Sequence, residues 1–292
     1  MLLHTPVMLK EVCEYLPQDS QLIVDCTLGH GGHAMALLSI AKEAKLIGFD
    51  IDEKMMEKAR LQIGARDEGL ETRIEFVRGN YASIVEVLAW RKADYILNDL
   101  GVNLEHFKDV SRGFSIRGDV PLDMRFDRSQ AQSAATIVNN YSATQLAHIF
   151  EHYADFSSAK ALELAQHIVS TRKQKLIQTT QEFKKILSDC GLGDPASIVI
   201  FQALRIETNK ELDNLQRFLA DFPDCLQLSW RCTIITYHSI EDRLVKQAFK
   251  ALVDTGNYAL VTKKPLKPDY KEVAANRAAR SAKIRIIEKI NE

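Results

Sequence analysis

Apolar runs and helix-forming segments alternate through the first hundred residues of this chain. Four short apolar runs begin at Leu22, Lys45, Ile74 and Ala93. Segments that favour helix lie between them, at 34–42, 53–63 and 84–90. Because strands separated by helices need crossover connections, this alternation predicts a mostly parallel sheet with helices on both faces.

The middle of the chain has helical periodicity instead. Apolar side chains recur at helical spacing from Leu146 to Tyr153, and a capping box at Thr179 and Glu182 precedes a second such stretch. No strand pattern interrupts this region, so we predict an inserted all-helical domain for substrate recognition. The predicted domains are residues 1–103 with 205–292, and residues 104–204.

Strand patterns return near the end of the chain, at 231–238, 258–262 and 282–288. A helix is expected from about Ile240 to Val253, but none separates the last two strands. The final pair is therefore predicted to be antiparallel. Together with the first four strands, these three complete a seven-stranded, Rossmann-like α/β sheet.

A glycine-rich turn follows the first strand, with Gly29, Gly31 and Gly32 within four residues. Without Cβ atoms there, a ligand can lie directly against the main chain. Asp50 ends the second strand and is positioned to accept both ribose hydroxyls of an adenosine held over the turn. Asp52, two residues later, is the alternative acceptor.

Two further strand ends carry polar or aromatic side chains. Tyr81 follows the third strand and is a candidate either for stacking on adenine or for core packing, and Asp99 ends the fourth strand. An adenosine ligand fits this set, which leaves NAD and S-adenosylmethionine as alternatives. A sheet that ends in two strands without an intervening helix favours the methyltransferase arrangement.

Composition narrows the class of protein. The hydrophobic content of 46% and charged content of 26% are typical of a folded globular chain. Five scattered cysteines argue against a disulfide framework and a zinc site, and no apolar stretch has the length of a membrane span or signal peptide. We therefore expect a cytoplasmic protein without a metal.

Charge is balanced overall and unbalanced locally. The net charge is −1, but residues 263–285 contain eight basic residues against two acids. This segment is either a phosphate-binding surface or a solvated face.

One short string suggests a different chemistry. His148-Ile-Phe-Glu-His152 matches the H-x-x-E-H pattern of inverted zinc proteases, with two imidazoles at i, i+4. The alternative is a surface histidine pair, which we favour because no partner acid stands out downstream.

Longer strings give the chain a family resemblance, nearly end to end. It resembles the bacterial S-adenosylmethionine-dependent methyltransferases that modify the N4 amine of a cytidine in 16S ribosomal RNA. Eight strings occur in the family's order: His4-Thr-Pro-Val-Met-Leu-Lys-Glu11, Asp25-Cys-Thr-Leu-Gly-His-Gly-Gly-His33, Asp99-Leu-Gly-Val102, Arg112-Gly-Phe-Ser115, Pro121-Leu-Asp-Met-Arg125, Phe201-Gln-Ala-Leu-Arg-Ile206 with Asn209 and Glu211-Leu212, Tyr237-His-Ser-Ile-Glu-Asp-Arg243, and Thr262-Lys-Lys-Pro265 leading to Ala279-Arg-Ser-Ala-Lys283.

The resemblance implies a class I methyltransferase fold with a helical insert and a cofactor site for S-adenosyl-L-methionine. The implied cofactor contacts are Gly31, Gly32, His33, Asp50, Tyr81 and Asp99. A further family contact is a glutamine, and His106 stands at its position here. The run Asn103-Leu-Glu-His106 replaces a usual Ser-Ser-Pro-Gln, so this loop departs most from the family pattern.

The implied activity is methylation of the cytosine N4 amine, whose lone pair is delocalised into the ring. We hypothesise that Asp99, or the corner formed by Tyr237 and His238, accepts a hydrogen of that amine. His238 is the candidate for taking the departing proton, because its unperturbed pKa lies near neutral pH. Its alternative role is structural, at the end of a strand.

The implied partner is 16S rRNA in the small ribosomal subunit, with no membrane and no metal. We expect RNA contacts near the start of the insert and in residues 263–285, here called the basic tail. The candidates are Arg112, Arg117, Arg125, Lys263, Lys264, Arg277, Arg280 and Lys283. For Arg125 the alternative is an ion pair with Asp123 or Asp127.

Two other functions remain open at this point: a non-catalytic RNA-binding assembly factor on a methyltransferase scaffold, and an NAD-dependent dehydrogenase. We expect a monomer or a weak homodimer.

Overall fold

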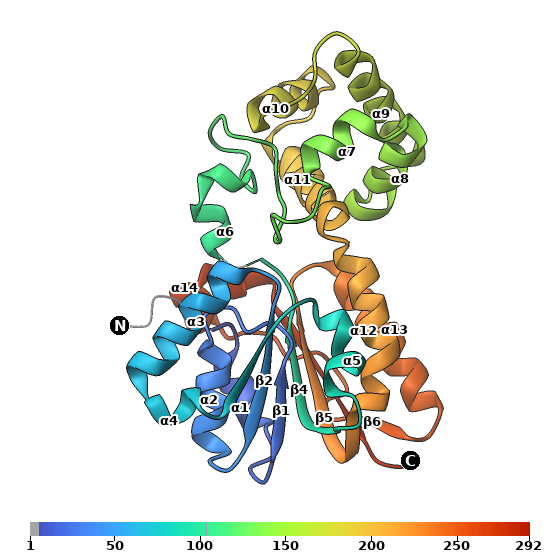
Figure 1. The fold of residues 1–292 in the computed structure, drawn as a ribbon. Helices are drawn as coiled ribbons and strands as arrows, with labels where there is room; N and C mark the ends of the chain where they lie inside the picture. The colour runs from blue at the N-terminus through green and yellow to red at the C-terminus, as the bar shows by residue number, and fades with distance from the viewer. Residues whose placement is uncertain (1–5, 103) are drawn as a thin grey trace. The chain divides into compact units, whose positions relative to one another are not determined.

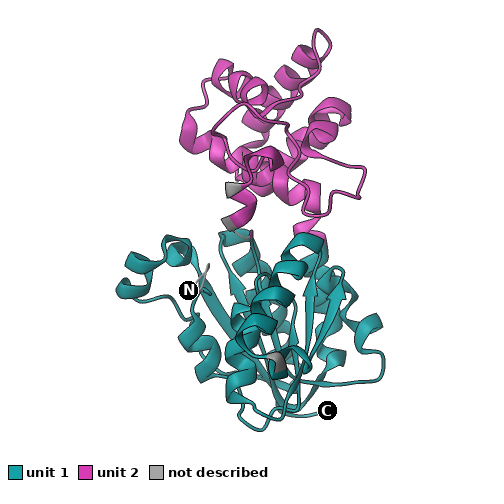
Figure 2. Ribbon diagram, turned by 60° about the vertical axis from the view of Figure 1, so that its left-hand side comes forward, with its two compact units in different colours: residues 1–101, 214–292 teal, residues 102–213 magenta. Residues whose placement is uncertain are grey.

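The computed structural model describes residues 6–102 and 104–292. His4 and Thr5 of the first family string, and Asn103, lie outside the described residues. The chain divides into two compact units, unit 1 with residues 1–101 and 214–292 and unit 2 with residues 102–213 (Figure 2). The boundary predicted at 204/205 falls inside helix α11 (Asp194–Asn209). That helix packs against two other helices of the insert, so it belongs wholly to unit 2.

Unit 1 is built on one seven-stranded sheet in the order β3-β2-β1-β4-β5-β7-β6 (Figure 1). The strands are β1 (Leu22–Asp25), β2 (Lys45–Asp50), β3 (Ile74–Arg78), β4 (Ala93–Asp99), β5 (Leu226–Thr236), β6 (Tyr258–Leu260) and β7 (Lys283–Lys289). Strand β7 is antiparallel to both β5 and β6, and the other pairs are parallel. This arrangement confirms the predicted class I methyltransferase fold and its closing antiparallel pair.

Alternating side chains of the strands bury two separate cores. Ile23 and Leu46 face one core, while their neighbours Val24 and Ile47 face the other. The first core is covered by α1 (Leu9–Glu14), α2 (Gly32–Ile40) and α3 (Glu53–Arg66). The second is covered by α5 (Ile84–Leu88), α12 (Glu211–Cys225) and α13 (Ser239–Asp254). The remaining helices of this unit are α4 (Glu68–Glu71), η1 (Tyr81–Ser83), α14 (Tyr270–Ala275) and η3 (Arg277–Ser281).

Strand β5 is longer than the sequence pattern indicates. It begins at Leu226 instead of Arg231, and its early part is irregular. Ser229 has φ of 69°, and the register against β4 shifts between Ala93 and Tyr95. Exposed polar residues in this part hide the alternation by which a strand is recognised.

Unit 2 is helical, with its own hydrophobic core. Its helices are α6 (Leu104–Lys108), η2 (Val110–Arg112), α7 (Ala134–Asn140), α8 (Ala143–Ala154), α9 (Ser158–Arg172), α10 (Thr180–Asp189) and α11. Helix α10 starts with the predicted capping box of Thr179 and Glu182. In the described part of the chain, no helix has the length and apolarity that crossing a membrane requires.

Candidate active site

The glycine turn joins β1 to α2 at the carboxyl ends of the parallel strands. Gly29 and Gly31 have φ of 53° and 76°, a region that glycine adopts without strain. The turn is closed by the Gly31 amide, which donates to the Leu28 carbonyl at 2.7 Å. A Cβ at Gly31 would lie 2.7 Å from Ile63 Cδ1, so a side chain does not fit there. Glycine at this position therefore allows the turn to pack closely against α3, as the glycine turns of nucleotide sites do.

Asp50 ties the end of β2 to this turn. Its Oδ2 accepts from the Gly29 amide at 2.9 Å, and its Oδ1 accepts from the Asp52 amide at 2.8 Å. Burial raises the pKa of Asp50 to about 7, against the opposing effect of both amides. Asp52 is buried and caps α3 by accepting from the Lys54 amide, so the geometry favours Asp50 as the ribose acceptor.

The ends of β4 and β5 bring three predicted residues together. The Tyr237 hydroxyl donates to Asp99 Oδ1 at 2.7 Å, and Asp99 Oδ2 lies 3.5 Å from His33 Nε2. Burial, aided by the charge of Asp99, raises the pKa of the Tyr237 phenol well above its usual range. Tyr237 therefore stays protonated and donates, which leaves Asp99 as the acceptor of the group.

Two buried polar residues complete this region, and our sequence reasoning did not single them out as site residues. Asp25 is 1% exposed and Asn98 is 0% exposed. Asp25 Oδ2 and both side-chain polar atoms of Asn98 have no hydrogen-bond partner among the described residues. Burial raises the pKa of Asp25 to about 6. Unpartnered buried polar atoms beside a glycine turn fit a site completed by a ligand. In the sequence, the signal that could have identified Asp25 and Asn98 was a polar residue at the end of an apolar strand.

Tyr81 lies in η1, directly after β3. Its ring packs edge-on against Phe218 of α12, with centroids 5.6 Å apart, and it is only partly buried. One edge of the ring therefore packs in the core. Both predicted roles, stacking on adenine and core packing, remain compatible with this position.

His238 caps the helix that follows β5. Its Nδ1 accepts from the Glu241 amide at 3.4 Å, and its Nε2 lies 3.1 Å from Glu241 Oε1. Both ring nitrogens thus face the start of α13. This geometry favours the structural alternative, and proton acceptance by His238 stays a prediction.

His106 lies in α6 of unit 2, where it is buried in an aromatic cluster. Its ring stacks on Phe114 and Phe126, with centroids 5.4 and 5.2 Å away. This packing accounts for its burial, and a cofactor contact there remains a prediction.

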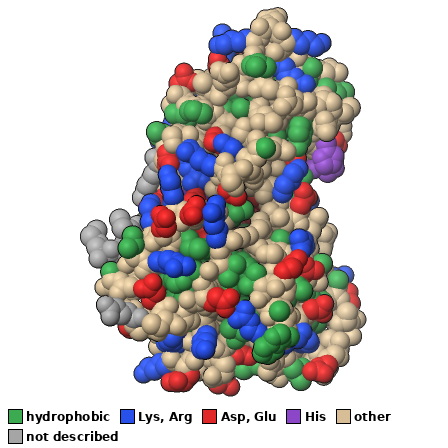
Figure 3. All heavy atoms as spheres, viewed as in Figure 1, with side chains coloured by type: hydrophobic (Ala, Val, Ile, Leu, Met, Phe, Trp, Pro, Cys, Tyr) green, Lys and Arg blue, Asp and Glu red, His purple; other side chains and the backbone are tan. Residues whose placement is uncertain are grey.

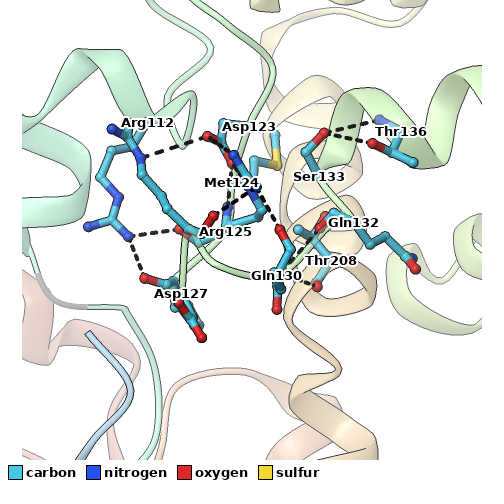
Figure 4. Close-up of polar contacts among 12 residues, drawn as sticks. Arg112, Asp123, Met124, Arg125, Asp127, Gln130, Gln132, Ser133, Thr136 and Thr208 are labelled. Atoms are coloured by element: carbon cyan, nitrogen blue, oxygen red, sulfur yellow. Dashed lines mark hydrogen bonds and ion pairs between the residues drawn. The ribbon is translucent and has the colours of Figure 1, made fainter. Parts of the chain in front are cut away.

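Two of the predicted RNA contacts in unit 2, Arg112 and Arg125, have partners within the chain, and their contact with RNA stays a prediction. The buried Arg112 donates to the carbonyls of Arg125 and Phe126 at 2.7 and 2.8 Å (Figure 4). Arg125 forms a bidentate pair with Asp123, at 2.6 and 3.0 Å, as its structural alternative required. Both guanidinium groups also donate to carbonyls of an irregular segment of main chain, and Arg125 stays partly exposed. Arg117 is exposed.

The basic tail separates into two groups. Lys263, Lys264, Arg277 and Arg280 are exposed. Lys283 instead pairs with Asp242 of α13 at 2.9 Å, and Arg285 pairs with the same carboxylate at 2.7 Å. Lys283 therefore connects β7 to α13, and its contact with RNA stays a prediction.

The H-x-x-E-H string lies on the exposed face of α8. The rings of His148 and His152 stack with centroids 4.0 Å apart, and the Glu151 carboxylate accepts from the Ser158 hydroxyl. Residues 6–102 and 104–292 contain no group of three or more His, Cys, Asp or Glu side chains suited to a metal ion. The geometry is that of a surface histidine pair.

Several known proteins are similar to this chain. A model of the MraW methylase family matches residues 1–290. Ribosomal RNA small subunit methyltransferase H of Elusimicrobium minutum is 40% identical over 297 residues, covering 98% of each chain. The protein of the same name from Endomicrobium trichonymphae is 38% identical over 295 residues, also with 98% of each chain covered. Among solved structures, PH0851 superposes with a TM-score of 0.50 at 11% identity, over 98% of this chain and 46% of that chain. This last likeness concerns the fold alone.

Proposed function

Because this chain belongs to the MraW methylase family, we propose that it is an S-adenosylmethionine-dependent methyltransferase that methylates the N4 amine of a cytidine in 16S rRNA of the small ribosomal subunit. The observation that carries the proposal is the Tyr237, Asp99 and His33 cluster beside the glycine turn. The family and the names of its relatives favour this activity over the dehydrogenase and the non-catalytic factor. Such a substrate makes the cytoplasm the proposed compartment.

The chain's own residues fit the cofactor. S-adenosylmethionine supplies, when bound, a methyl group made electrophilic by its sulfonium. The bare main chain of Gly31 and Gly32 approaches the ligand, with His33 beside it, and the Asp50 carboxylate accepts the ribose hydroxyls. Each Asp50 oxygen already accepts one amide hydrogen and retains a second lone pair for a hydroxyl.

Asp99 is proposed to make the cytosine amine reactive. Its carboxylate accepts a hydrogen bond from the N4 amine, which directs the nitrogen lone pair toward the methyl group. As the N–C bond replaces the methyl–sulfur bond, the same carboxylate accepts the proton that the nitrogen releases. Tyr237 holds one carboxylate oxygen by its 2.7 Å hydrogen bond, so the other oxygen is oriented for the substrate. The target base must leave its stack to reach this place, and we propose that unit 2, Arg117 and the basic tail hold the RNA while it does so.

The decisive experiment uses labelled cofactor. The protein is incubated with S-adenosylmethionine carrying a labelled methyl group and with unmodified small ribosomal subunits, and the modified nucleotide is mapped. Label on the N4 of a single cytidine supports the proposal. RNA binding without transfer would establish the non-catalytic factor, and nicotinamide binding in a cofactor titration would establish the dehydrogenase.

Cofactor affinity should depend on pH through Asp50. Its pKa of about 7 means that the carboxyl is partly protonated at neutral pH. Ribose hydroxyls that donate to the carboxylate favour the charged form, so affinity should rise with pH by at most about tenfold per unit and level off above about pH 7. Calorimetric titration from about pH 5 to about pH 9 measures this directly. The Asp50→Asn variant should bind more weakly with a flatter profile, and a flat wild-type profile would contradict the assignment.

The exposed tail cations should contribute to RNA binding and not to cofactor binding. Replacing Lys263 and Lys264 with alanine removes two cations that pair with no carboxylate in the described part of the chain. For each phosphate that the variant no longer neutralises, the slope of log Kd against log salt should fall by about 1. Filter binding at several salt concentrations measures the slope. An unchanged slope would place the RNA footprint elsewhere.

A further inference from the structure

The segment from Lys263 to Arg280, here called the cationic segment, has cations that its acids do not neutralise. Its six cations are Lys263, Lys264, Lys267, Lys271, Arg277 and Arg280, all exposed. Across residues 6–102 and 104–292, none of them forms an ion pair or a side-chain hydrogen bond. By contrast, the visible face of the molecule intersperses basic and acidic side chains (Figure 3).

Both acids of the cationic segment are occupied by main-chain amides. Asp269 caps α14 by accepting from the Glu272 amide at 2.8 Å. Glu272 accepts from the Met8 amide, which ties α14 to the start of the chain's first helix. The positive charge therefore faces solvent, where a polyanion can neutralise it.

An aromatic side chain stands among these cations. Tyr270, the first residue of α14, is 87% exposed. The ring therefore lies largely in solvent and is not part of the hydrophobic core of unit 1. Single-stranded nucleic acids are bound by this combination, in which cations follow the phosphates and an aromatic ring stacks on a base.

The cationic segment lies next to the candidate active site. Leu266 pairs with Ile284 of β7, and Ala279 belongs to the same hydrophobic core as the partly buried Tyr237. Glu272 of α14 lies within electrostatic reach of Tyr237 and His33. In Figure 1, α14 lies at the end of the sheet from which α3 starts. Tyr270, which begins α14, is therefore at the same end of the sheet as Asp99.

We propose that Tyr270 is a stacking platform for an unpaired base of the substrate RNA near the target cytidine, while the cationic segment holds the adjoining phosphates. The inference rests on the proposed function and adds a specific residue to it. Stacking here would keep the flanking strand open and so help to hold the target base out of its helix.

The chain offers a matched control for Tyr270. Trp90, between α5 and β4, is 86% exposed. Its basic neighbours are occupied, since Arg91 pairs with Glu75 and Lys92 donates to the Asp224 carbonyl. Removal of this ring tests the effect of losing an exposed aromatic group without unpaired cations.

The test compares Tyr270→Ala, Tyr270→Phe and Trp90→Ala. The probe is a single-stranded RNA with 2-aminopurine beside the cytidine, whose fluorescence is quenched by stacking. Tyr270→Ala should bind about 5- to 100-fold more weakly and lose the quenching, while Tyr270→Phe retains both because the ring is kept. On unmodified small subunits, Tyr270→Ala should raise KM and leave kcat within about twofold. Trp90→Ala should match wild type in every measurement.

Failure of the inference and failure of the function are distinguishable. If wild type transfers label to small subunits but Tyr270→Ala keeps its KM and quenching, the stacking role is wrong and the function stands. If wild type transfers no label, the function is wrong, and the quenching still decides whether Tyr270 binds RNA. An equal loss in Trp90→Ala would also overturn the inference, because it would show a general effect of surface rings.

Discussion

Replacing Asp99 with asparagine is expected to lower kcat by about 10²- to 10⁴-fold, the range of a lost acid–base group. Asparagine has the same shape as aspartate, and its Oδ1 can still accept from the Tyr237 hydroxyl, which in the wild-type protein lies 2.7 Å from Asp99 Oδ1. It presents no charge to the amine, however, and cannot stabilise the positive charge that develops on the attacking nitrogen. The measurement is a single-turnover rate with saturating cofactor and small subunits.

Tyr237, the hydrogen-bond partner of Asp99, provides the comparison. Tyr237→Phe removes the hydroxyl that orients Asp99 and leaves the carboxylate in place, so its kcat should fall by about 10-fold, roughly the value of one hydrogen bond. Cofactor affinity and thermal unfolding are measured on both variants to separate catalysis from binding and folding. A kcat for Asp99→Asn within twofold of wild type would remove Asp99 from the chemistry.

The sheet could be predicted from sequence because it depends on local pattern. Ile23 and Val24 face opposite cores, and the same alternation recurs in the neighbouring strands. Parallel strands then bring Asp50, Asp99 and the glycine turn to one edge without further information. Membership of the MraW methylase family confirms the resemblance read from the eight strings.

What the sequence could not predict depends on long-range pairing. Arg112 and Arg125 look like surface cations, yet their partners are main-chain carbonyls and Asp123. Lys283 and Lys263 look alike in sequence, and only the position of Asp242 on α13 distinguishes them. A guanidinium or ammonium group that has a partner within the chain must share or give up that contact to bind RNA, and a linear pattern does not record such partners.

His238 also shows that a sequence does not reveal which contacts a side chain makes. Imidazole chemistry and its position made it a candidate for proton transfer, but a residue before a helix is also a candidate cap. The contacts with Glu241 show the cap geometry, which the sequence could not distinguish from the catalytic alternative. Proton transfer by His238 stays a prediction.

Replacing Gly31 with alanine should reduce both the stability of unit 1 and its affinity for the cofactor. The left-handed φ of 76° costs an alanine about 1–2 kcal/mol, and its Cβ would lie 2.7 Å from Ile63 Cδ1, an overpacking cost of about 1–3 kcal/mol. The two costs together are a large part of a typical domain's free energy of unfolding. Any shift of the turn that relieves them moves the main chain away from Asp50, so cofactor affinity should fall by at least about tenfold.

Two further variants separate the packing cost from the cost of the left-handed φ. Gly79→Ala is the matched control, because no heavy atom lies within 4 Å of its added Cβ and its φ is outside the left-handed region. Ile63→Val removes the Cδ1 atom that the new Cβ would strike and leaves Cγ1, which would lie 3.1 Å away. In the double variant with Gly31→Ala the packing cost should therefore fall, and the φ cost should remain. Thermal unfolding and calorimetric titration measure both quantities. If Gly31→Ala alone binds the cofactor as wild type does, the ligand does not depend on this turn, and the site must be sought away from the end of β1.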